Sequence, residues 1–308
     1  MDADLRGSSL VRCSRGSEYH QVTHAVASVD PPVDEDGTLR RLEGRENFPV
    51  ALRILPSTLR RELRSVYDVA RTIDDLGDEA AGDRGRWLDS FEADLLQIWQ
   101  PGGEPRATVL RRLVPTVRHH DLPPEPFRNL IAANRLDQTQ RTYPTWDDLR
   151  DYCRLSADPV GRIVLGLVDA TTPETVELSD RICTALQVLE HCQDVGEDRR
   201  RGRTYLPLAD LEDCGVALAD LDAPSAGPRV RALLKLEVDR AVSLLTAGAP
   251  LVRRLTGSGR LAVAGFAAGG FATADAIRRA EYDVLGVACR PAKRDVLRHA
   301  ARLWRGRP

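Results

Sequence analysis

The sequence predicts an all-α protein in which one domain is built from stacked long helices. Apolar residues recur at helical spacing along most of the chain after Glu46, and short segments with Pro or Gly separate these stretches. Alternating β-branched runs bounded by turns are nearly absent. The 308 residues are 42% hydrophobic and 29% charged, so the chain can bury a large core.

The first expected helix covers residues 57–78, where an apolar stripe runs from Leu59 to Ile73 after a helix-starting Pro56. The second covers residues 84–99 and stops at Pro101-Gly102-Gly103. Further helices are expected over residues 106–118, 125–139, 146–169 with a bend at Pro159, 174–198, 228–254 and 260–285, with a short one after Pro291.

Residues 1–43 are expected to form a disordered or loosely attached extension, and residues 44–308 the helical domain. The extension is polar and is interrupted by Pro31-Pro32. His20 and His24 have the i,i+4 spacing of a metal pair, but no Glu stands between them, so chance spacing is the preferred interpretation. The start of the chain lacks a basic segment followed by an apolar one, which predicts a cytoplasmic protein.

Composition argues against several classes of protein. The formal net charge of −2 gives no general electrostatic reason to bind nucleic acid. The longest small and apolar stretch, residues 261–272, is too short to span a bilayer. The six cysteines form no Cys-x-x-Cys pair, which makes zinc ribbons and secreted disulfide scaffolds poor candidates.

Two segments contain aspartates at i,i+4 spacing, Asp74 with Asp78 and Asp194 with Asp198. At 3.6 residues per turn, each pair lies on one face of its expected helix. Other polar residues extend both stripes: Tyr67 and Arg71 extend the first, and Gln187 and Glu190 extend the second.

These stripes oppose helix stability. Like charges at i,i+4 cost about 0.2–0.5 kcal/mol per pair, and both pairs are expected near helix C-termini, where the macrodipole disfavours anions. Gly77 and Gly196 weaken the helices further. A bound divalent cation would reverse each electrostatic term, and oxygen-only ligands favour Mg²⁺ or Mn²⁺.

The alternative to a metal site is a solvated acidic face at two helix ends, which for a single cluster would be preferred. Two clusters with polar residues on the same stripes favour the metal site. A ferritin-like di-iron centre would need Glu-x-x-His repeats, and the sequence contains none.

The chain resembles the squalene/phytoene synthase family of head-to-head prenyl transferases over about residues 45–300. The resemblance depends on both acidic segments, on Gln187, and on three further stretches: Tyr152-Cys-Arg-Leu-Ser156, Ala157-Asp-Pro-Val-Gly161-Arg162 and Arg203-Thr-Tyr205-Leu-Pro207. It implies a single-domain isoprenoid synthase-type bundle with a central cavity, in which the two acidic helices hold Mg²⁺ (or Mn²⁺) against an isoprenoid diphosphate.

Within this family, Glu46-Asn-Phe-Pro-Val50 and residues 156–162 resemble the bacterial hopanoid-pathway branch of hydroxysqualene synthases. That branch ionises presqualene diphosphate, rearranges the cation and captures water, so no NADPH is expected. The resemblance implies a partner enzyme that supplies presqualene diphosphate. Head-to-head condensation to presqualene diphosphate, squalene or phytoene stays open as an alternative. A non-catalytic helical scaffold is the alternative of another class, and the intact acidic pairs argue against it.

The resemblance also implies roles for single residues. Asp74, Asp78, Asp194 and Asp198 are the expected metal ligands. Tyr152 and Glu190 are the expected catalytic residues: Tyr152 would orient the leaving group or shield a cation, and Glu190, which stands where the family usually has Asn, would be a ligand, a base for water or a neutral acid. The expected substrate-binding residues are Asn47, Phe48, Tyr67, Arg71, Gln187, Gln193 and Tyr282.

The assignment of Arg71 has an alternative, and two positions, Gln193 and Phe271, depart from the pattern of the family. Arg71 is preferred as a diphosphate clamp over an intrahelical salt bridge. Gln193 replaces an Arg of condensing members, which makes condensation less favoured, and Phe271 stands where relatives often have Tyr.

Two longer segments have two interpretations each. The run Arg199-Arg200-Arg201-Gly-Arg203 is expected to be a solvated helix end, with contact to a phosphate or an anionic membrane as the alternative. Membrane contact would place the protein peripherally at the inner face of the membrane. Residues 261–274 are expected to combine close helix packing with room for an isoprenoid tail.

Overall fold

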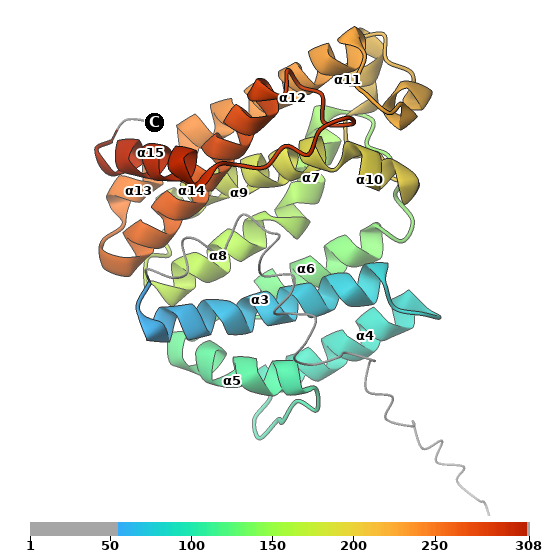
Figure 1. Cartoon of the computed structure of the whole chain (residues 1–308). Helices are drawn as coiled ribbons and strands as arrows, with labels where there is room; N and C mark the ends of the chain where they lie inside the picture. The colour runs from blue at the N-terminus through green and yellow to red at the C-terminus, as the bar shows by residue number, and fades with distance from the viewer. Residues whose placement is uncertain (1–54, 307–308) are drawn as a thin grey trace, which may run out of the picture. The chain divides into compact units, whose positions relative to one another are not determined.

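The structure is a computed structural model that describes residues 55–306, and α-helices with short connections make up this range without a β-strand (Figure 1). The predicted all-α class is therefore confirmed. The elements are α3 (Ser57–Asp78), α4 (Arg84–Leu95), η1 (Leu96–Trp99), α5 (Thr108–His120), α6 (Glu125–Leu136), α7 (Trp146–Ser156), α8 (Asp158–Leu167), α9 (Pro173–Gln193), α10 (Val195–Arg200), α11 (Leu208–Asp213), η2 (Leu218–Asp222), α12 (Pro228–Gly248), α13 (Leu251–Arg254), α14 (Gly257–Arg279) and α15 (Lys293–Trp304).

The helix α3 has the bounds that the sequence predicts. It begins after Pro56, whose carbonyl accepts the first helical hydrogen bond from the Arg60 amide. Its apolar stripe is buried against α4, α5 and α6. The opposite side of α3 contains the polar residues of the first acidic segment.

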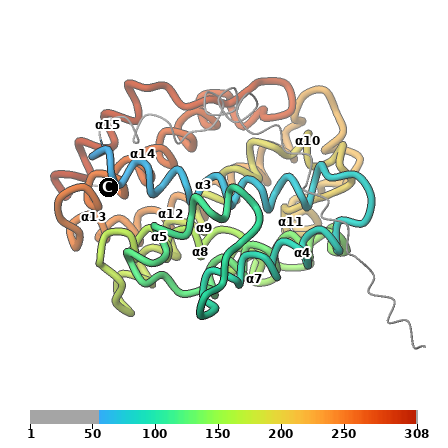
Figure 2. The backbone as a smooth tube through the Cα atoms, turned by 90° about the horizontal axis from the view of Figure 1, so that it is seen from below, coloured from blue at the N-terminus to red at the C-terminus, as the bar shows by residue number. Residues whose placement is uncertain are grey.

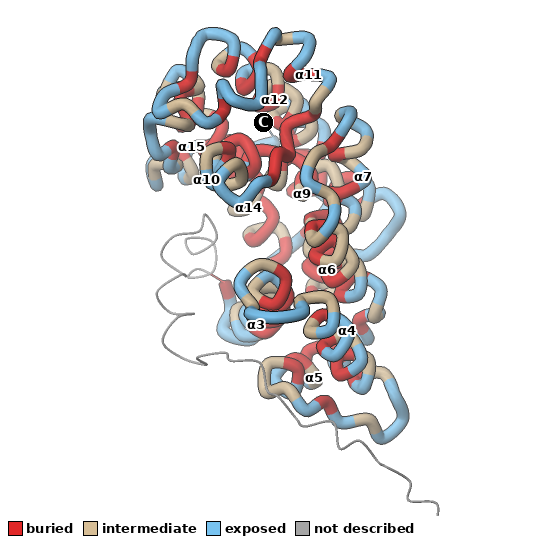
Figure 3. The backbone as a smooth tube through the Cα atoms, turned by 90° about the vertical axis from the view of Figure 1, so that its right-hand side faces the viewer, coloured by how far each residue is buried: buried red, intermediate tan, exposed pale blue. Residues whose placement is uncertain are grey.

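The helix α9 packs between α8 and α12 (Figures 1 and 2). A capping box of Thr172 and Thr175 fixes its start, with Pro173 in the first turn. Close approach to α8 depends on Gly161, because a side chain there would overlap Ser179 and Cys183. The apolar residues of these helices face one another, and Figure 3 shows the buried positions on the inner sides of neighbouring helices.

Three helices predicted as continuous are interrupted. The bend expected at Pro159 is a break at Ala157, because Pro159 sits in the first turn of α8, where a missing N–H costs no helical hydrogen bond. Pro250 starts α13 and ends the helix predicted over 228–254 in the same way. The third break falls at Asp194, without a proline, where φ is −101° and ψ is 12°.

The C-terminal boundaries also differ from the prediction. The helix expected over residues 260–285 is α14 and ends at Arg279, because Glu281 and Tyr282 adopt positive φ and turn the chain. The prediction missed the short elements α11 and η2. No helix among residues 55–306 is long and apolar enough to cross a bilayer.

Every described residue belongs to one compact unit of the chain. The boundary predicted near residue 43 lies outside the described residues, and so do Asn47 and Phe48.

Candidate functional site

The first acidic pair lies on the last two turns of α3, and both of its carboxylates have partners. The side-chain amide of Asn134 donates to Asp74 at 3.0 Å. Arg203 donates to Asp78 at 2.7 Å, and Arg201 lies 3.6 Å from its other oxygen. Burial raises the pKa of Asp74 to about 6, although its hydrogen bond with Asn134 opposes the shift.

Gly77 explains how α6 reaches this pair. A side chain at Gly77 would overlap Asn134, so glycine permits the close approach of the two helices. Gln138 then donates to the Gly77 carbonyl at 3.0 Å, one turn beyond Asn134. The glycine that weakens α3 is therefore the residue that allows an amide to stand beside Asp74.

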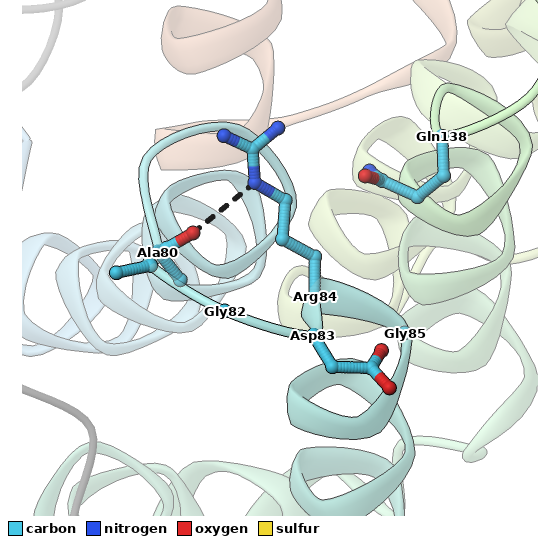
Figure 4. Close-up of a pocket in the computed structure, with 7 residues that line it drawn as sticks. Ala80, Gly82, Asp83, Arg84, Gly85 and Gln138 are labelled. Carbon is cyan, nitrogen blue, oxygen red and sulfur yellow. Dashed lines mark hydrogen bonds between the residues drawn. The ribbon is translucent and has the colours of Figure 1, made fainter.

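An open depression lies at the end of α3 and is separate from the acidic pairs. Figure 4 shows Gln138 facing the loop between α3 and α4, where Arg84 donates to the Ala80 carbonyl at 3.2 Å. The depression is lined by Gln138 and by residues 80–85. No carboxylate of either acidic pair lines it, so it is not the candidate site.

The second acidic pair lies where α9 gives way to α10. Asp194 is the junction residue, and its carbonyl accepts hydrogen bonds from the amides of Glu197 and Asp198 at 2.8 Å each. Asp198 therefore lies in the first turn of a helix, where the macrodipole favours an anion. The expected long helix ends at Asp194, and Asp198 lies instead in α10, a helix of six residues that ends at Arg200.

The charged groups around the second acidic pair differ from those around the first. Burial is the main cause that raises the pKa of Asp198 to about 8, and Asp194 and Glu190 raise it further. The pKa of Asp194 is also raised, by burial and then by Glu197. Among the described residues, no arginine or lysine forms an ion pair with Asp194 or Asp198. His191 Nδ1 is 3.9 Å from Asp198, but burial lowers the pKa of His191 to about 3 and keeps the imidazole neutral.

Arg203 links the two pairs. It is 6% exposed, holds Asp78, and acts against the raised pKa of Asp198. The prediction that residues 199–203 form a solvated helix end is wrong for Arg203, because the chain after α10 turns back and buries its guanidinium. Arg199 instead pairs with the exposed Asp222 at 2.8 Å.

A buried aromatic cluster surrounds Asp137 beside Arg203. Tyr152 donates to Asp137 at 2.7 Å, and Tyr205 donates to its other oxygen at 3.1 Å. Burial raises the pKa of Asp137, and Arg203 acts in the opposite direction. The His191 ring stacks on Tyr205 at 3.8 Å. Tyr152 therefore contributes its ring to the cluster, while its hydroxyl is engaged with a carboxylate.

The remaining predicted residues of the two stripes lie near the pairs. Tyr67 acts electrostatically on Arg71, which forms an i,i+4 ion pair with Asp75 at 2.8 Å. Gln187 lies 3.2 Å from His191 Nε2. Glu190 is exposed and close enough to raise the pKa of Asp198.

Two predicted substrate-binding residues have structural partners elsewhere. Gln193 donates to the Cys289 carbonyl, so its amide anchors the segment after α14. Tyr282 interacts with Arg278 and Lys235, and the described contacts do not connect it to either acidic pair.

Two guanidinium groups near the acidic pairs retain unused donors. The Nε atoms of Arg71 and Arg203 are buried and have no acceptor within the described part of the chain. Buried donors usually have partners, so two orphaned N–H groups on one cationic pair of residues suit an anionic ligand.

The α14 segment combines packing with free space. A methyl group at Gly270 would meet Leu186 at 2.6 Å and Leu245 at 3.0 Å, so glycine is needed there for helix packing. The same group at the buried Gly269 would meet no atom within 4 Å. Gly270 thus supports the interpretation that this segment packs closely against other helices, and Gly269 supports the interpretation that it leaves space beside it.

Two residues of this site, Asn134 and Asp137, belong to no motif in the sequence and were not predicted. Arg203 belongs to the motif Arg203-Thr-Tyr205-Leu-Pro207, but its run was expected to be solvated, with contact to a phosphate as the alternative. The local signal for Asn134 is weak, because its i,i+4 spacing to Gln138 falls in a segment that also contains Arg135, Asp137 and Thr139.

Comparisons with known proteins agree with this geometry. The family model described as Squalene/phytoene synthase matches residues 42–300. The chain is 36% identical over 214 residues to a hydroxysqualene synthase of Rhodopseudomonas palustris, covering 68% of this chain and 71% of the relative. It is 31% identical over 235 residues to a 15-cis-phytoene synthase of Synechococcus elongatus, covering 71% and 75%.

Solved structures give the same result. The crystal structure of squalene synthase HpnC from Alicyclobacillus acidocaldarius superimposes with a TM-score of 0.73 at 45% identity, over 80% of this chain and 93% of that one. A dehydrosqualene synthase in complex with ligand, 24% identical, has the same fold with a TM-score of 0.78 over 86% and 93%. With its sequence match, its helices and its two acidic pairs, the chain belongs to the squalene/phytoene synthase family.

Proposed function

We propose that this protein is a Mg²⁺-dependent hydroxysqualene synthase that ionises presqualene diphosphate, rearranges the cation and captures water. The observation that carries the proposal is the linkage of the two acidic pairs through Arg203, with unused donors on Arg203 and Arg71 beside them. The similarity to hydroxysqualene synthases supports the choice of branch.

The donor chemistry fits a hard divalent cation. Asp74, Asp78, Asp194 and Asp198 would hold Mg²⁺, because they offer only carboxylate oxygens. The raised pKa values of Asp74 and Asp198 indicate carboxylates that lack enough positive charge around them, which an ion would provide. When bound, Mg²⁺ neutralises charge on the diphosphate and so makes it a better leaving group.

The protein's own groups would position the diphosphate. The Nε atoms of Arg71 and Arg203 lack an acceptor but are buried, so each would donate to a phosphate oxygen after its side chain moves towards the ligand, while other N–H groups of both residues contact carboxylates. Tyr152 would not donate to the leaving group, because its hydroxyl donates to Asp137. Its ring, which packs at tilted angles against Tyr143 and Tyr205, would shield a carbocation.

Water capture needs a dry cavity with one positioned water. Glu190 stands on the same stripe as Gln187 and Asp194 and acts electrostatically on Asp198, so it would hold that water or accept its proton. The space beside Gly269 would receive part of the isoprenoid tail. Because water is the nucleophile, the reaction would proceed without NADPH.

Condensation of two allylic diphosphates is the alternative within the family, and the similarity to phytoene synthases favours it. The test is to incubate the purified chain and Mg²⁺ with presqualene diphosphate or with farnesyl diphosphate, in H₂¹⁸O, with and without NADPH. We expect labelled hydroxysqualene from presqualene diphosphate in both cases. Squalene that depends on reductant, or product from farnesyl diphosphate alone, would overturn the branch assignment.

The substrate's lipid character is matched by a surface on α15. Its exposed side contains Leu297, 64% exposed, and Trp304, 46% exposed, and basic residues surround them: Arg290, Lys293, Arg294, Arg298, Arg302 and Arg305. Such a basic amphipathic helix is typical of contact with an anionic membrane. This surface is a second candidate for membrane contact, beside the alternative considered for Arg199–Arg203, and it would place the enzyme where a partner enzyme releases presqualene diphosphate. Sedimentation with anionic vesicles, weakened in Leu297→Glu, would test it.

A further inference from the structure

A second group of potential metal ligands lies outside the acidic site. Glu62 on α3 and His119 and His120 in the last turn of α5 bring one ligand atom each to within 4.8 Å of one another. Glu62 precedes Asp74 by twelve residues on the same helix, which is about 18 Å along its axis. The group is therefore distinct from the site proposed for the diphosphate.

The contact between His120 and Glu62 has an unusual geometry. His120 Nε2 lies 3.3 Å from Glu62 Oε1, and their side chains are only 9% and 12% exposed. Even so, Nε2 is buried and makes no hydrogen bond in the described part of the chain. Buried polar atoms without a partner are rare and require an explanation.

A metal ion provides that explanation. Zinc binds histidine nitrogen at about 2.0–2.1 Å and carboxylate oxygen at about 2.0–2.2 Å in tetrahedral geometry, which places two ligand atoms about 3.3–3.5 Å apart. The distance between His120 and Glu62 falls at this value, although the two atoms are not aligned as donor and acceptor. An ion between them would be bound by a lone pair of His120 Nε2 and by a lone pair of Glu62 Oε1.

The surroundings hold the ligands in place. Ser65 and Thr116, each one turn from a ligand, form a buried hydrogen bond at 3.1 Å that fixes α3 against α5. The two histidine rings meet edge to face at 4.6 Å. The C-terminal end of α5 also favours a cation through the helix macrodipole.

We propose that Glu62, His119 and His120 bind a transition-metal dication of the Zn²⁺ class, with water in the fourth position, and that the ion cross-links α3 to α5. Two imidazole ligands select Zn²⁺, Co²⁺, Ni²⁺ or Cu²⁺ over Mg²⁺, in contrast to the carboxylate-only ligands of the acidic site. The helix that presents Asp74 and Asp78 is thereby anchored at its other end.

The test is a Zn²⁺ titration of the untagged, reduced chain in saturating Mg²⁺, which keeps the acidic site occupied. We expect one tight Zn²⁺ site and a rise in the thermal unfolding midpoint of about 5–10 °C at Zn²⁺ 100-fold above its Kd. His120→Ala and Glu62→Gln should lower Zn²⁺ affinity by at least about tenfold to a hundredfold, because loss of a ligand costs no less than loss of an outer-shell partner.

Two further variants keep the result unambiguous. His119→Ala changes an exposed residue and is expected to fold normally, so its loss of Zn²⁺ affinity and of Co²⁺ visible absorption reports on ligation alone. The double variant of His20 and His24 to Ala is the control for the other histidine pair and should keep the tight site. Unchanged Zn²⁺ affinity in His119→Ala, or loss of the site in the double variant, would refute the proposal.

Discussion

The two acidic pairs of this protein have the same spacing but different surroundings. Asp74 and Asp78 stand on an uninterrupted helix, where an amide and two arginines already compensate them. Asp194 and Asp198 stand at a helix break, where burial is the main cause that raises both pKa values. Glu197 raises the pKa of Asp194 further, Asp194 raises that of Asp198, and no arginine of the described chain forms an ion pair with either carboxylate. The first pair therefore has direct ion-pair partners within the chain, whereas Arg201 and Arg203 act on the second pair without forming an ion pair with it.

Because of this difference, we expect the two acidic pairs to contribute differently to stability and to metal binding. The first has ion-pair partners before any metal binds, because Arg203 and Arg201 contact Asp78, while burial still raises the pKa of Asp74 to about 6. The second gains most from a cation, since an ion removes both the repulsion and the cost of burying charge. We expect metal affinity to depend more on the second pair and structural stability more on the partners of the first.

The largest expected effect is on turnover. Asp194→Asn and Asp74→Asn should each reduce turnover by about 100- to 1000-fold, with Asp194→Asn at the upper end, because each removes a ligand that stabilises developing charge. Turnover and Mg²⁺ affinity measured together would check this, with helical circular dichroism nearly unchanged. Near-normal turnover in both variants would contradict the metal assignment.

Arg203→Gln should deprive the first acidic pair of its main ion-pair partner, so that its contribution to stability depends on Mg²⁺. Removing this buried guanidinium leaves Asp78 with Arg201 alone and should lower the free energy of unfolding by about 2–3 kcal/mol without Mg²⁺, and by less with it. Urea unfolding with and without Mg²⁺ measures both values. Arg199→Gln is the matched control, because its partner Asp222 is exposed; equal losses in both variants would remove the special role of Arg203.

The pH dependence of metal binding separates the pairs further. The pKa of Asp198 is about 8 in the folded chain, above its ordinary value of 3.8, so without metal the folded state keeps a proton that the unfolded chain has released. Stability should then fall as pH rises from about 4 to about 8. Because Mg²⁺ competes with that proton, its affinity should rise over pH 6–8 by up to about tenfold per unit.

Mg²⁺ titrations at pH 6, 7 and 8 would measure this slope. In Asp198→Asn the slope should become much shallower, since the group that exchanges its proton is gone. A slope that persists unchanged would locate the titrating group elsewhere.

The smallest expected effect belongs to Asn134→Ala. Its amide lowers the pKa of Asp74, so in the variant the rise of Mg²⁺ affinity with pH should move to higher pH. The variant should also lose about 1 kcal/mol of unfolding free energy, because one hydrogen bond is removed. Asn129→Ala, on the same helix, is the control for truncation of an asparagine. A larger effect in the control would show that α6 itself, and not the bond to Asp74, is sensitive.

Local patterns in the sequence predicted the structural features that depend on residues close to one another in the chain. The stripe of α3, the bend at Pro159 and the two acidic pairs all follow from short-range spacing, although the exact break at Ala157 was not located. The break at Pro250 was not predicted, because a continuous helix was expected over residues 228–254. The break at Asp194 has no Pro to signal it. Its bridge-region backbone is stabilised by two hydrogen bonds to its own carbonyl, which a periodicity argument cannot detect.

The residues that contact the acidic pairs and the cluster beside them were not predictable from the sequence, and the reason is a different one. Asn134, Asp137 and Arg203 act across helices that are far apart in sequence, and their side chains look ordinary in their own segments. In the run Arg199–Arg203, the sequence does not distinguish the buried Arg203 from the exposed Arg200. Only the path of the chain after α10 makes that distinction.

The ion pair of Arg203 with Asp78 has a consequence for folding, because its members are 125 positions apart. The contact of Asn134 with Asp74 spans 60 positions and closes a shorter loop, so its entropic cost is lower. A growing chain can thus assemble α3 and α6 while Asp78 and Asp137 still lack Arg203. Closure of the charge network waits for the second half of the chain, which makes the acquisition of a binding-competent site a late folding event.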